Sequence, residues 1–253
     1  MIKREKEVWE SGRVRTITFI VTKDCQLACK YCYLVAKNKN ERMNFKVAQK
    51  AVDYILSERK IFNEPSVAFE FIGGEPFLEI ELIDKISDYI KKELYVKEHP
   101  WFNSYRFGFT TNGLLYNDTK VQQYIEKNKS HISITITIDG IQKKHDIQRV
   151  YANGKGSYND VVKNIPLWVK QFEESSTKVT VSSDDIPYIK ESVLHLWRLE
   201  IPNVYINAVY ESIWKEEDDL ILEKQLIELA VECRRRNHFA VRRTGGQNDI
   251  RLI

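Results

Sequence analysis

Residues 24–33 read Asp24-Cys-Gln-Leu-Ala-Cys-Lys-Tyr-Cys-Tyr33 and follow an apolar, β-branched segment, Val14-Arg-Thr-Ile-Thr-Phe-Ile-Val21. The β-branched segment predicts a buried strand that leads directly into the cysteines. Three of the four cysteines of the chain, Cys25, Cys29 and Cys32, lie in this C-x3-C-x2-C run. The run therefore concentrates the thiol chemistry of the protein in one short loop.

Three kinds of site use cysteines at such spacings. A cubane iron–sulfur cluster held by three thiolates would keep one iron free to bind another ligand. A structural zinc site would need a fourth ligand, but Cys233 is about two hundred residues away and the nearest histidine is His99. A disulfide would need an oxidising compartment, for which no targeting sequence argues. The spacing favours the cluster over the other two.

The rest of the chain alternates between strand and helix patterns, judged by β-branched content, period-two alternation and helical spacing of apolar residues. Strands are predicted at 14–21, 66–72, 105–111, 131–138, 178–182 and 204–209, and helices at 43–58, along the face Leu82 to Ile90, at 117–129, from Ser157 with a bend at Pro166, at 188–198 and at 220–236. Six β-α units predict a parallel sheet, doubly wound or curled into a partial barrel.

Two local details of the helices are also predicted. The helix at 43–58 would bury Val47 together with Ala48 and Val52 on one stripe. Ser157 and Asp160 would form a capping box at the start of their helix.

Parallel β/α folds place their sites at the carboxyl ends of strands, so the segments after the strands are the candidates for function. The motifs there are Gly73-Gly-Glu-Pro76, Thr110-Thr-Asn-Gly113, Thr137-Ile-Asp-Gly140 followed by His145, Asp146 and Arg149, Ser182-Ser-Asp-Asp185, and Tyr210-Glu-Ser212. Each also has a plainer interpretation as a turn, a helix cap or a solvated charge. Glycine pairs would let a ligand approach the backbone closely.

With Tyr31 before the last cysteine, the loop has the pattern C-x3-C-x-aromatic-C of the radical S-adenosylmethionine (radical SAM) enzymes. The chain resembles that superfamily because Gly-Gly-Glu-Pro, Thr-Asn-Gly and Asp-Gly follow in order after successive strands. The His-Asp-x-x-Arg run and Gly154-Lys-Gly-Ser-Tyr158 resemble its peptide and sulfatase maturase (SPASM-type) branch. The resemblance implies an α/β fold with a parallel-sheet partial (β/α)6 barrel.

The resemblance also implies two cofactors, a 4Fe–4S cluster and S-adenosyl-L-methionine (SAM). Cys25, Cys29 and Cys32 would be the metal ligands. The residues that would bind SAM or line its site are Tyr31, Gly73, Gly74, Glu75, Pro76, Thr111, Asn112, Thr137, Asp139, Arg149 and Ser182. In this interpretation Glu75 holds the amino group of the methionine moiety and Arg149 its carboxylate.

The implied activity is reductive cleavage of SAM to a 5′-deoxyadenosyl radical, which abstracts hydrogen from a peptide or protein side chain, such as that of a ribosomal precursor peptide. Its electron would come from a low-potential donor such as flavodoxin or ferredoxin. The chain departs from the branch because no cysteine-rich SPASM segment follows Arg236. Two alternatives stay open: a truncated paralogue that binds the cluster, SAM or peptide without turnover, and a radical SAM enzyme acting on a small molecule.

The composition and net charge limit which partners and which cellular location are expected. The chain has 253 residues, 43% of them hydrophobic, and a net charge of +3. Such a weak charge implies neither a nucleic-acid nor a membrane partner, and the N-terminus lacks a signal-peptide or membrane-spanning run. The protein is therefore expected in the cytoplasm. The expected domains are an extension at 1–13, the core at 14–215 and a C-terminal helix with a short tail at 216–253.

Overall fold

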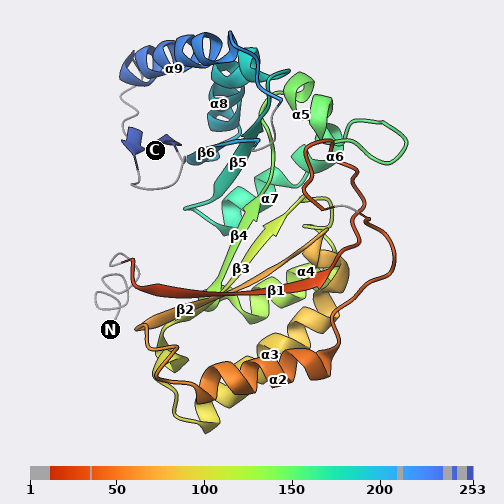
Figure 1. Cartoon of the computed structure of the whole chain (residues 1–253), viewed down its shortest axis with the longest axis vertical. Coiled ribbons are helices and arrows are strands. Elements are labelled where there is room, and N and C mark those ends of the chain that lie inside the picture. The colour runs from red at the N-terminus through yellow and green to blue at the C-terminus, as the bar shows by residue number, and fades with distance from the viewer. Residues whose placement is uncertain (1–11, 35, 210–212, 236–240, 244–249, 253) are drawn as a thin grey trace. The chain divides into compact units, whose positions relative to one another are not determined.

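The computed structural model of the protein describes residues 12–34, 36–209 and 213–235, and the backbone of 241–243 and 250–252 (Figure 1). The chain divides into two compact units. Unit 1 comprises Met1–Cys25, Leu34–Thr111 and Leu115–Ile134, and unit 2 comprises Gln26–Tyr33, Asn112–Leu114 and Thr135–Ile253. The cysteine stretch therefore passes from unit 1 to unit 2 directly after Cys25.

Unit 1 is built on a sheet with the strand order β1-β2-β3-β4, in which β1 pairs with β2 and β2 with β3 in parallel. The sheet has the β-α alternation expected from the sequence. Its elements are β1 (Val14–Thr22), α2 (Phe45–Ser57), β2 (Ser66–Gly73), the 3-10 helix η1 (Pro76–Glu79), α3 (Ile80–Val96), η2 (Pro100–Asn103), β3 (Tyr105–Thr111), α4 (Thr119–Lys127), η3 (Lys129–His131) and β4 (Ile132–Ile136).

Phenylalanines spaced two residues apart form the core of this sheet. The strand register places Phe19 beside Phe71, and Phe71 beside Phe109. The ring centroids of these two pairs lie 5.6 and 5.4 Å apart. Burying each Phe contributes roughly 1.5–3 kcal/mol through the hydrophobic effect, so this row stabilises unit 1.

The helices α2 and α3 lie side by side on one side of the sheet (Figure 1). Asn44 caps α2 by accepting a hydrogen bond from the Lys46 amide at 2.8 Å. Ala48 and Val52 are buried as predicted, but Val47 is 58% exposed, so its expected burial was wrong. The buried stripe is narrower than the apolar residues of this helix suggest.

Unit 2 contains a second sheet with the strand order β5-β6-β8-β7. The strands β5 and β6 are parallel as expected, whereas β8 pairs antiparallel with both β6 and β7. The elements are α5 (Gln142–Gln148), α6 (Tyr158–Val162), α7 (Ile165–Gln171), β5 (Ser176–Val181), η4 (Ile186–Tyr188), α8 (Ile189–Arg198), β6 (Asn203–Ala208), α9 (Asp218–Arg235), β7 (Val241–Arg243) and β8 (Ile250–Leu252).

Unit 2 differs from the expectation in three respects. The helix α5 was not predicted, because seven residues are too few to show a helical period. The single bent helix after Ser157 is two helices, α6 and α7, with Pro166 in the first turn of α7, where proline needs no amide hydrogen bond. The three-residue strands β7 and β8 were also missed.

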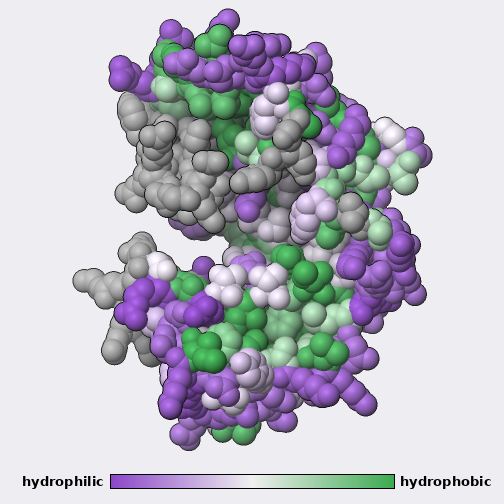
Figure 2. All heavy atoms as spheres, viewed as in Figure 1, coloured by the Kyte–Doolittle hydropathy of each residue, from purple (hydrophilic) through white to green (hydrophobic). Residues whose placement is uncertain are grey.

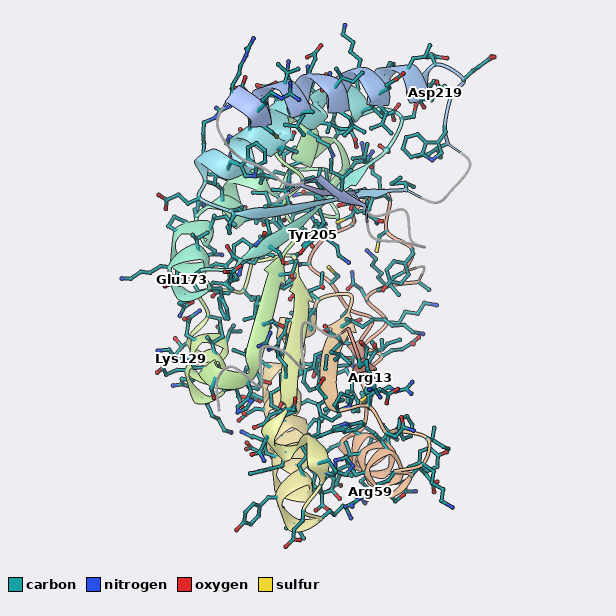
Figure 3. The ribbon with its side chains drawn as sticks, turned by 90° about the vertical axis from the view of Figure 1, so that its left-hand side faces the viewer. Arg13, Arg59, Lys129, Glu173, Tyr205 and Asp219 are labelled. Carbon is teal, nitrogen blue, oxygen red and sulfur yellow. The ribbon has the colours of Figure 1, made fainter. Side chains whose placement is uncertain are left out.

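The helix α9 has a largely polar outer surface, and Figure 2 shows hydrophilic side chains along it. Figure 3 labels Asp219 in its first turn and Tyr205 in β6. Among the residues that the structure describes, no helix is both long and apolar enough to cross a membrane. The expected rim residues Tyr210, Glu211 and Ser212 lie outside the described residues.

Candidate active site

The cysteine stretch begins where β1 ends. Cys25, Cys29 and Cys32 form no disulfide; Cys25 is buried and the other two are half-buried. The amide of Cys25 donates a 2.9 Å hydrogen bond to Oδ1 of Asn38, and the Cys32 amide donates to the Cys29 carbonyl at 3.1 Å. Within the described ranges no three His, Cys, Asp or Glu side chains are gathered in a metal-ligating arrangement, so the cysteine ligand set stays a prediction. Three cysteine side chains are the donor set that an iron–sulfur cluster takes.

The glycines of the Gly-Gly-Glu-Pro motif lie against the backbone that leads into the cysteines. The Gly74 amide donates to the Thr22 carbonyl at 3.0 Å, and the Glu75 amide donates to the Asp24 carbonyl at 2.9 Å. A Cβ at Gly74 would lie 2.3 Å from the Asp24 oxygen, and one at Gly73 would lie 2.2 Å from the Thr22 oxygen. At both positions, therefore, it is the backbone of residues 22–24 that approaches the glycine closely and leaves no room for a Cβ.

Glu75 is fully buried and is already hydrogen-bonded. Its Oε1 accepts from the Phe77 amide at 3.1 Å and from the Thr111 hydroxyl at 2.7 Å. The first of these bonds caps η1, in which Pro76 occupies a first-turn position. Two residues expected at the SAM site from consecutive strands, Glu75 and Thr111, are thus joined directly.

Asn112, in unit 2, lies in a turn and also contacts the cysteine stretch. Its Oδ1 accepts from the Leu114 amide at 2.9 Å, and its Nδ2 donates to Oε1 of Gln26 at 3.1 Å. The turn needs Gly113, whose φ is +80° and whose added Cβ would lie 2.7 Å from Ile136. Asn112 and Gly113 therefore form a tight turn, and Asn112 also makes a hydrogen bond to Gln26.

A short antiparallel pairing holds the middle of the cysteine stretch. Leu27 forms a β-bridge with Tyr151, the Ala28 amide donates to the Val150 carbonyl at 2.7 Å, and the Lys30 amide donates to the Gln148 carbonyl at 2.9 Å. Residues 27–30 thus run beside residues 148–151 in register. This register places Arg149 opposite Cys29.

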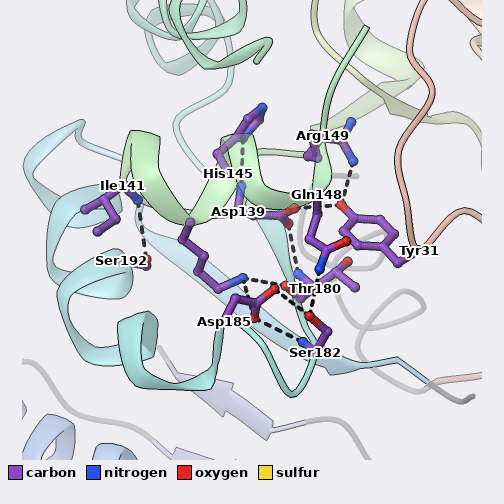
Figure 4. Close-up of polar contacts among 11 residues, drawn as sticks. Tyr31, Asp139, Ile141, His145, Gln148, Arg149, Thr180, Ser182, Asp185 and Ser192 are labelled. Atoms are coloured by element: carbon purple, nitrogen blue, oxygen red, sulfur yellow. Dashed lines mark hydrogen bonds and ion pairs between the residues drawn. The ribbon is translucent and has the colours of Figure 1, made fainter. Parts of the chain in front are cut away.

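Tyr31, Asp139 and Arg149 form a polar chain in which Asp139 and Arg149 are buried and Tyr31 is half-buried (Figure 4). The Tyr31 hydroxyl donates to Oδ2 of Asp139 at 2.6 Å and accepts from Nη1 of Arg149 at 2.9 Å. Oδ1 of Asp139 accepts from the Thr180 amide at 2.9 Å, so this carboxylate also links the segment that follows β4 to β5 within unit 2. Nε of Arg149 is buried without a hydrogen-bond partner among the residues that the structure describes.

The electrostatics of this chain favour a neutral tyrosine and a charged arginine. Burial and then the Asp139 carboxylate raise the pKa of Tyr31 well above its usual value. Burial alone would lower the pKa of Arg149, but Tyr31, Cys29 and Asp139 raise it by Coulombic interaction. The guanidinium is therefore a permanent positive charge inside unit 2.

His145 also contacts this polar chain, through hydrogen bonds to Asp139 and Ser157. Its Nδ1 accepts from the Asp139 amide at 3.3 Å, and its Nε2 lies 3.0 Å from Oγ of Ser157, which donates to the Arg149 carbonyl at 2.8 Å. Burial, followed by Arg149, lowers the pKa of His145 to about 3. A neutral imidazole with its proton on Nε2 satisfies both contacts.

The hydroxyl of Ser157 is therefore not a helix cap, and the expected capping box was wrong. The α6 amide of Tyr158 donates instead to Oδ1 of Asp146 at 2.9 Å. Asp146 is the second residue of the His-Asp-x-x-Arg run. The first two residues of this run, His145 and Asp146, therefore both make hydrogen bonds within the protein.

Ser182 is held by two side chains. Its hydroxyl donates to Oδ2 of Asp185 and accepts from Nε2 of Gln148, both at 2.8 Å. Asp185 in turn pairs with the fully buried Lys144 at 3.3 Å. Thr137 is half-buried directly after β4. Gln148 and Lys144 of this region were not predicted, and neither was Asn38, which accepts from the Cys25 amide in unit 1. Single polar residues in loops and short helices carry no sequence period.

A family model described as Radical SAM superfamily matches residues 19–192. An uncharacterized protein of Methanocaldococcus jannaschii, MJ0907, is 33% identical over 70% of this chain and 56% of its own length. A cysteine-type anaerobic sulfatase-maturating enzyme of Clostridium novyi is 30% identical over 57% of this chain and 37% of its own length. The chain thus spans about half or less of these curated relatives.

The fold is shared with solved structures. One of them, native anSMEcpe with bound AdoMet and Cp18Cys peptide, superposes with a TM-score of 0.73 at 19% identity, covering 88% of this chain and 61% of that one. This likeness confirms the expected fold class, and the family match covers most of the chain. The protein belongs to the radical SAM superfamily, with the partial (β/α)6 barrel fold of its members and with their cofactors, a 4Fe–4S cluster and SAM.

Proposed function

We propose that this protein cleaves SAM reductively and uses the resulting radical to abstract hydrogen from a side chain of a peptide or protein. The observation that carries the proposal is the 2.9 Å hydrogen bond from the Glu75 amide to the Asp24 carbonyl. It attaches the Gly-Gly-Glu-Pro loop to the residue that immediately precedes Cys25. The acid expected to bind SAM and the first expected cluster ligand are thereby parts of one local structure in unit 1.

Cys25, Cys29 and Cys32 would ligate the cluster. When bound, the cluster and SAM supply a 5′-deoxyadenosyl radical after one-electron reduction, and the protein supplies orientation and exclusion of water. The loop residues around the thiols are fixed by Asn38 at Cys25 and by the pairing of residues 27–30 with 148–151. Such fixed backbone is what a metal site needs to hold its ligands in a defined arrangement.

Glu75 would accept hydrogen bonds from the amino group of SAM. Its carboxylate is held by Phe77 and Thr111, so it need not be ordered when the cofactor binds. The other residues expected at the SAM site stay predictions: Tyr31, Gly73, Gly74, Pro76, Thr111, Asn112, Thr137, Asp139, Arg149 and Ser182.

The peptide or protein substrate is supported by the relatives. One is a sulfatase-maturating enzyme, and the solved structure of anSMEcpe has both AdoMet and a peptide bound. A ribosomal precursor peptide is one substrate of this class. The electron would come from flavodoxin or ferredoxin, and both the oxygen-sensitive cluster and its reductant suit the cytoplasm.

The first experiment is anaerobic reconstitution with iron and sulfide, reduction with dithionite, addition of SAM and quantification of 5′-deoxyadenosine. Cys29→Ala should abolish the product. Cys233→Ala is the matched control, since this free thiol is buried on α9, outside the cysteine stretch, and should leave the product unchanged. A fully loaded cluster without deoxyadenosine would contradict enzymatic SAM cleavage and favour a protein that binds without turnover.

The substrate class needs a separate experiment. The reconstituted protein would receive either peptides from a digest of fully deuterated cell protein or the deuterated small-molecule extract of the same cells. Deuterium entering 5′-deoxyadenosine from the peptide pool would support the proposal. Deuterium entering only from the small-molecule pool would refute it and assign a small-molecule substrate.

A further inference from the structure

The register of the pairing between residues 27–30 and 148–151 defines what faces the central cysteine. The bridge of Leu27 with Tyr151 and the two flanking amide bonds of Ala28 and Lys30 leave Cys29 opposite Arg149. All these residues belong to unit 2. A cationic side chain is thus tied by backbone hydrogen bonds to the position of one thiol.

The charge of Arg149 is also fixed in place. The side chain is only 6% exposed, and its Nη1 is held by the Tyr31 hydroxyl at 2.9 Å. The same hydroxyl donates to Asp139 at 2.6 Å, so a carboxylate lies on the far side of the tyrosine. Nε of Arg149 keeps a hydrogen without an acceptor among the described residues, which fits an anionic acceptor beside it.

A buried charge changes the energy of a nearby redox centre. Reduction adds one negative charge to an iron–sulfur cluster, and a positive charge in a low-dielectric interior stabilises that form. Water screens such a charge little when the group is buried. Arg149 should therefore favour reduction, and Asp139 should oppose it more weakly because Tyr31 stands between.

We propose that Arg149 is an electrostatic residue of the cluster: its buried positive charge opposite Cys29 raises the reduction potential of the 4Fe–4S cluster, and the Asp139 carboxylate, linked through Tyr31, moderates this effect. The inference rests on the proposed function in one respect, namely that Cys29 ligates the cluster. In this role Arg149 acts on the cluster before SAM binds.

The test is the midpoint potential of the reconstituted cluster without SAM or peptide, titrated with dithionite and followed by electron paramagnetic resonance of the reduced form. Arg149→Gln should lower the ratio of reduced to oxidised cluster at least tenfold at a fixed potential, a shift of about 59 mV for one electron. Arg149→Lys, which keeps the charge, should stay close to the wild-type protein.

The decisive readout is the sign of the change. Asp139→Asn removes a negative charge from the same hydrogen-bonded chain and should raise the potential. A purely structural role of the chain would loosen the cysteine stretch in both variants and would not produce opposite shifts. Iron and sulfide content, measured for each variant, verifies that the cluster is intact.

Equal potentials in the wild-type protein and Arg149→Gln would overturn the proposal. If Arg149→Gln assembles no cluster, Asp139→Asn decides, since it keeps the guanidinium, and an unchanged or lowered potential then overturns the proposal. Loss of the cluster in both variants would also contradict it, because the chain would then serve assembly rather than potential. Failure of the wild-type protein itself to assemble a cluster would instead refute the proposed function.

Discussion

The Thr111 hydroxyl donates a 2.7 Å hydrogen bond to the Glu75 carboxylate, and neither side chain is more than 2% exposed. The bond connects the end of β3 to the loop after β2. It holds the acid in one orientation before any cofactor is present. Preorganisation of this kind lowers the entropy lost when a ligand binds.

Thr111→Val keeps the shape of the side chain but removes this donor. We expect a loss of about 1–3 kcal/mol in the free energy of unfolding, because a buried carboxylate oxygen loses a partner, and a weaker affinity for SAM. Urea denaturation and calorimetric titration with SAM measure the two effects. Thr110→Val is the control, since Thr110 is exposed on the same strand; equal losses in both variants would disprove the role of the bond.

Gly74→Ala places a methyl group 2.3 Å from the Asp24 carbonyl oxygen. The backbone must shift to relieve this contact, so both the unfolding temperature and the iron content after reconstitution should fall. Gly154→Ala provides the comparison: its φ of +82° is unfavourable for alanine, but nothing lies within 4 Å of the added carbon. That strain alone costs roughly 1 kcal/mol, so a Gly74→Ala protein as stable as Gly154→Ala would contradict the clash.

Lys144 forms a fully buried ion pair with Asp185 at 3.3 Å and donates to the Thr180 carbonyl at 2.5 Å. Lys144→Met would leave the carboxylate buried without its cation, at a cost of about 3–5 kcal/mol in unfolding free energy. Lys143→Met, at the exposed neighbour that lies over the Tyr188 ring, should cost at most about 1 kcal/mol. Chemical denaturation of both variants would show whether the difference exists.

His145 predicts a pH dependence of stability. Burial, with Arg149 next in weight, lowers its pKa to about 3, whereas the unfolded imidazole titrates near pH 6.5. Between these values the unfolded chain binds more protons, so the stability contributed by neutral His145 is complete above pH 6.5 and falls as the pH falls.

The measurement is the unfolding free energy at pH 7 and pH 5 for the wild-type protein and for His145→Gln. The wild-type protein should lose more stability over this interval, because the glutamine variant has no proton to gain at this position. An identical loss in the two proteins would show that His145 does not carry this pH dependence.

Much of the architecture follows from local sequence patterns. The strands β1, β2 and β3 were predicted almost to the residue, because β-branched and aromatic residues are concentrated in them. The short elements α5, β7 and β8 were not predicted, since three to seven residues do not establish a helical or strand period. Val47 lies on an apolar stripe but remains exposed, because packing partners rather than composition decide burial.

The sequence by itself determined the three thiols, the order of motifs after successive strands and thereby the family, since these depend on spacing along the chain. Only the tertiary structure decided which polar groups are already engaged. Tyr31 meets Arg149 across 118 residues and Asp139 across 108. Such contacts depend on how strands and loops pack in three dimensions, and no local pattern encodes that Arg149 stands opposite Cys29.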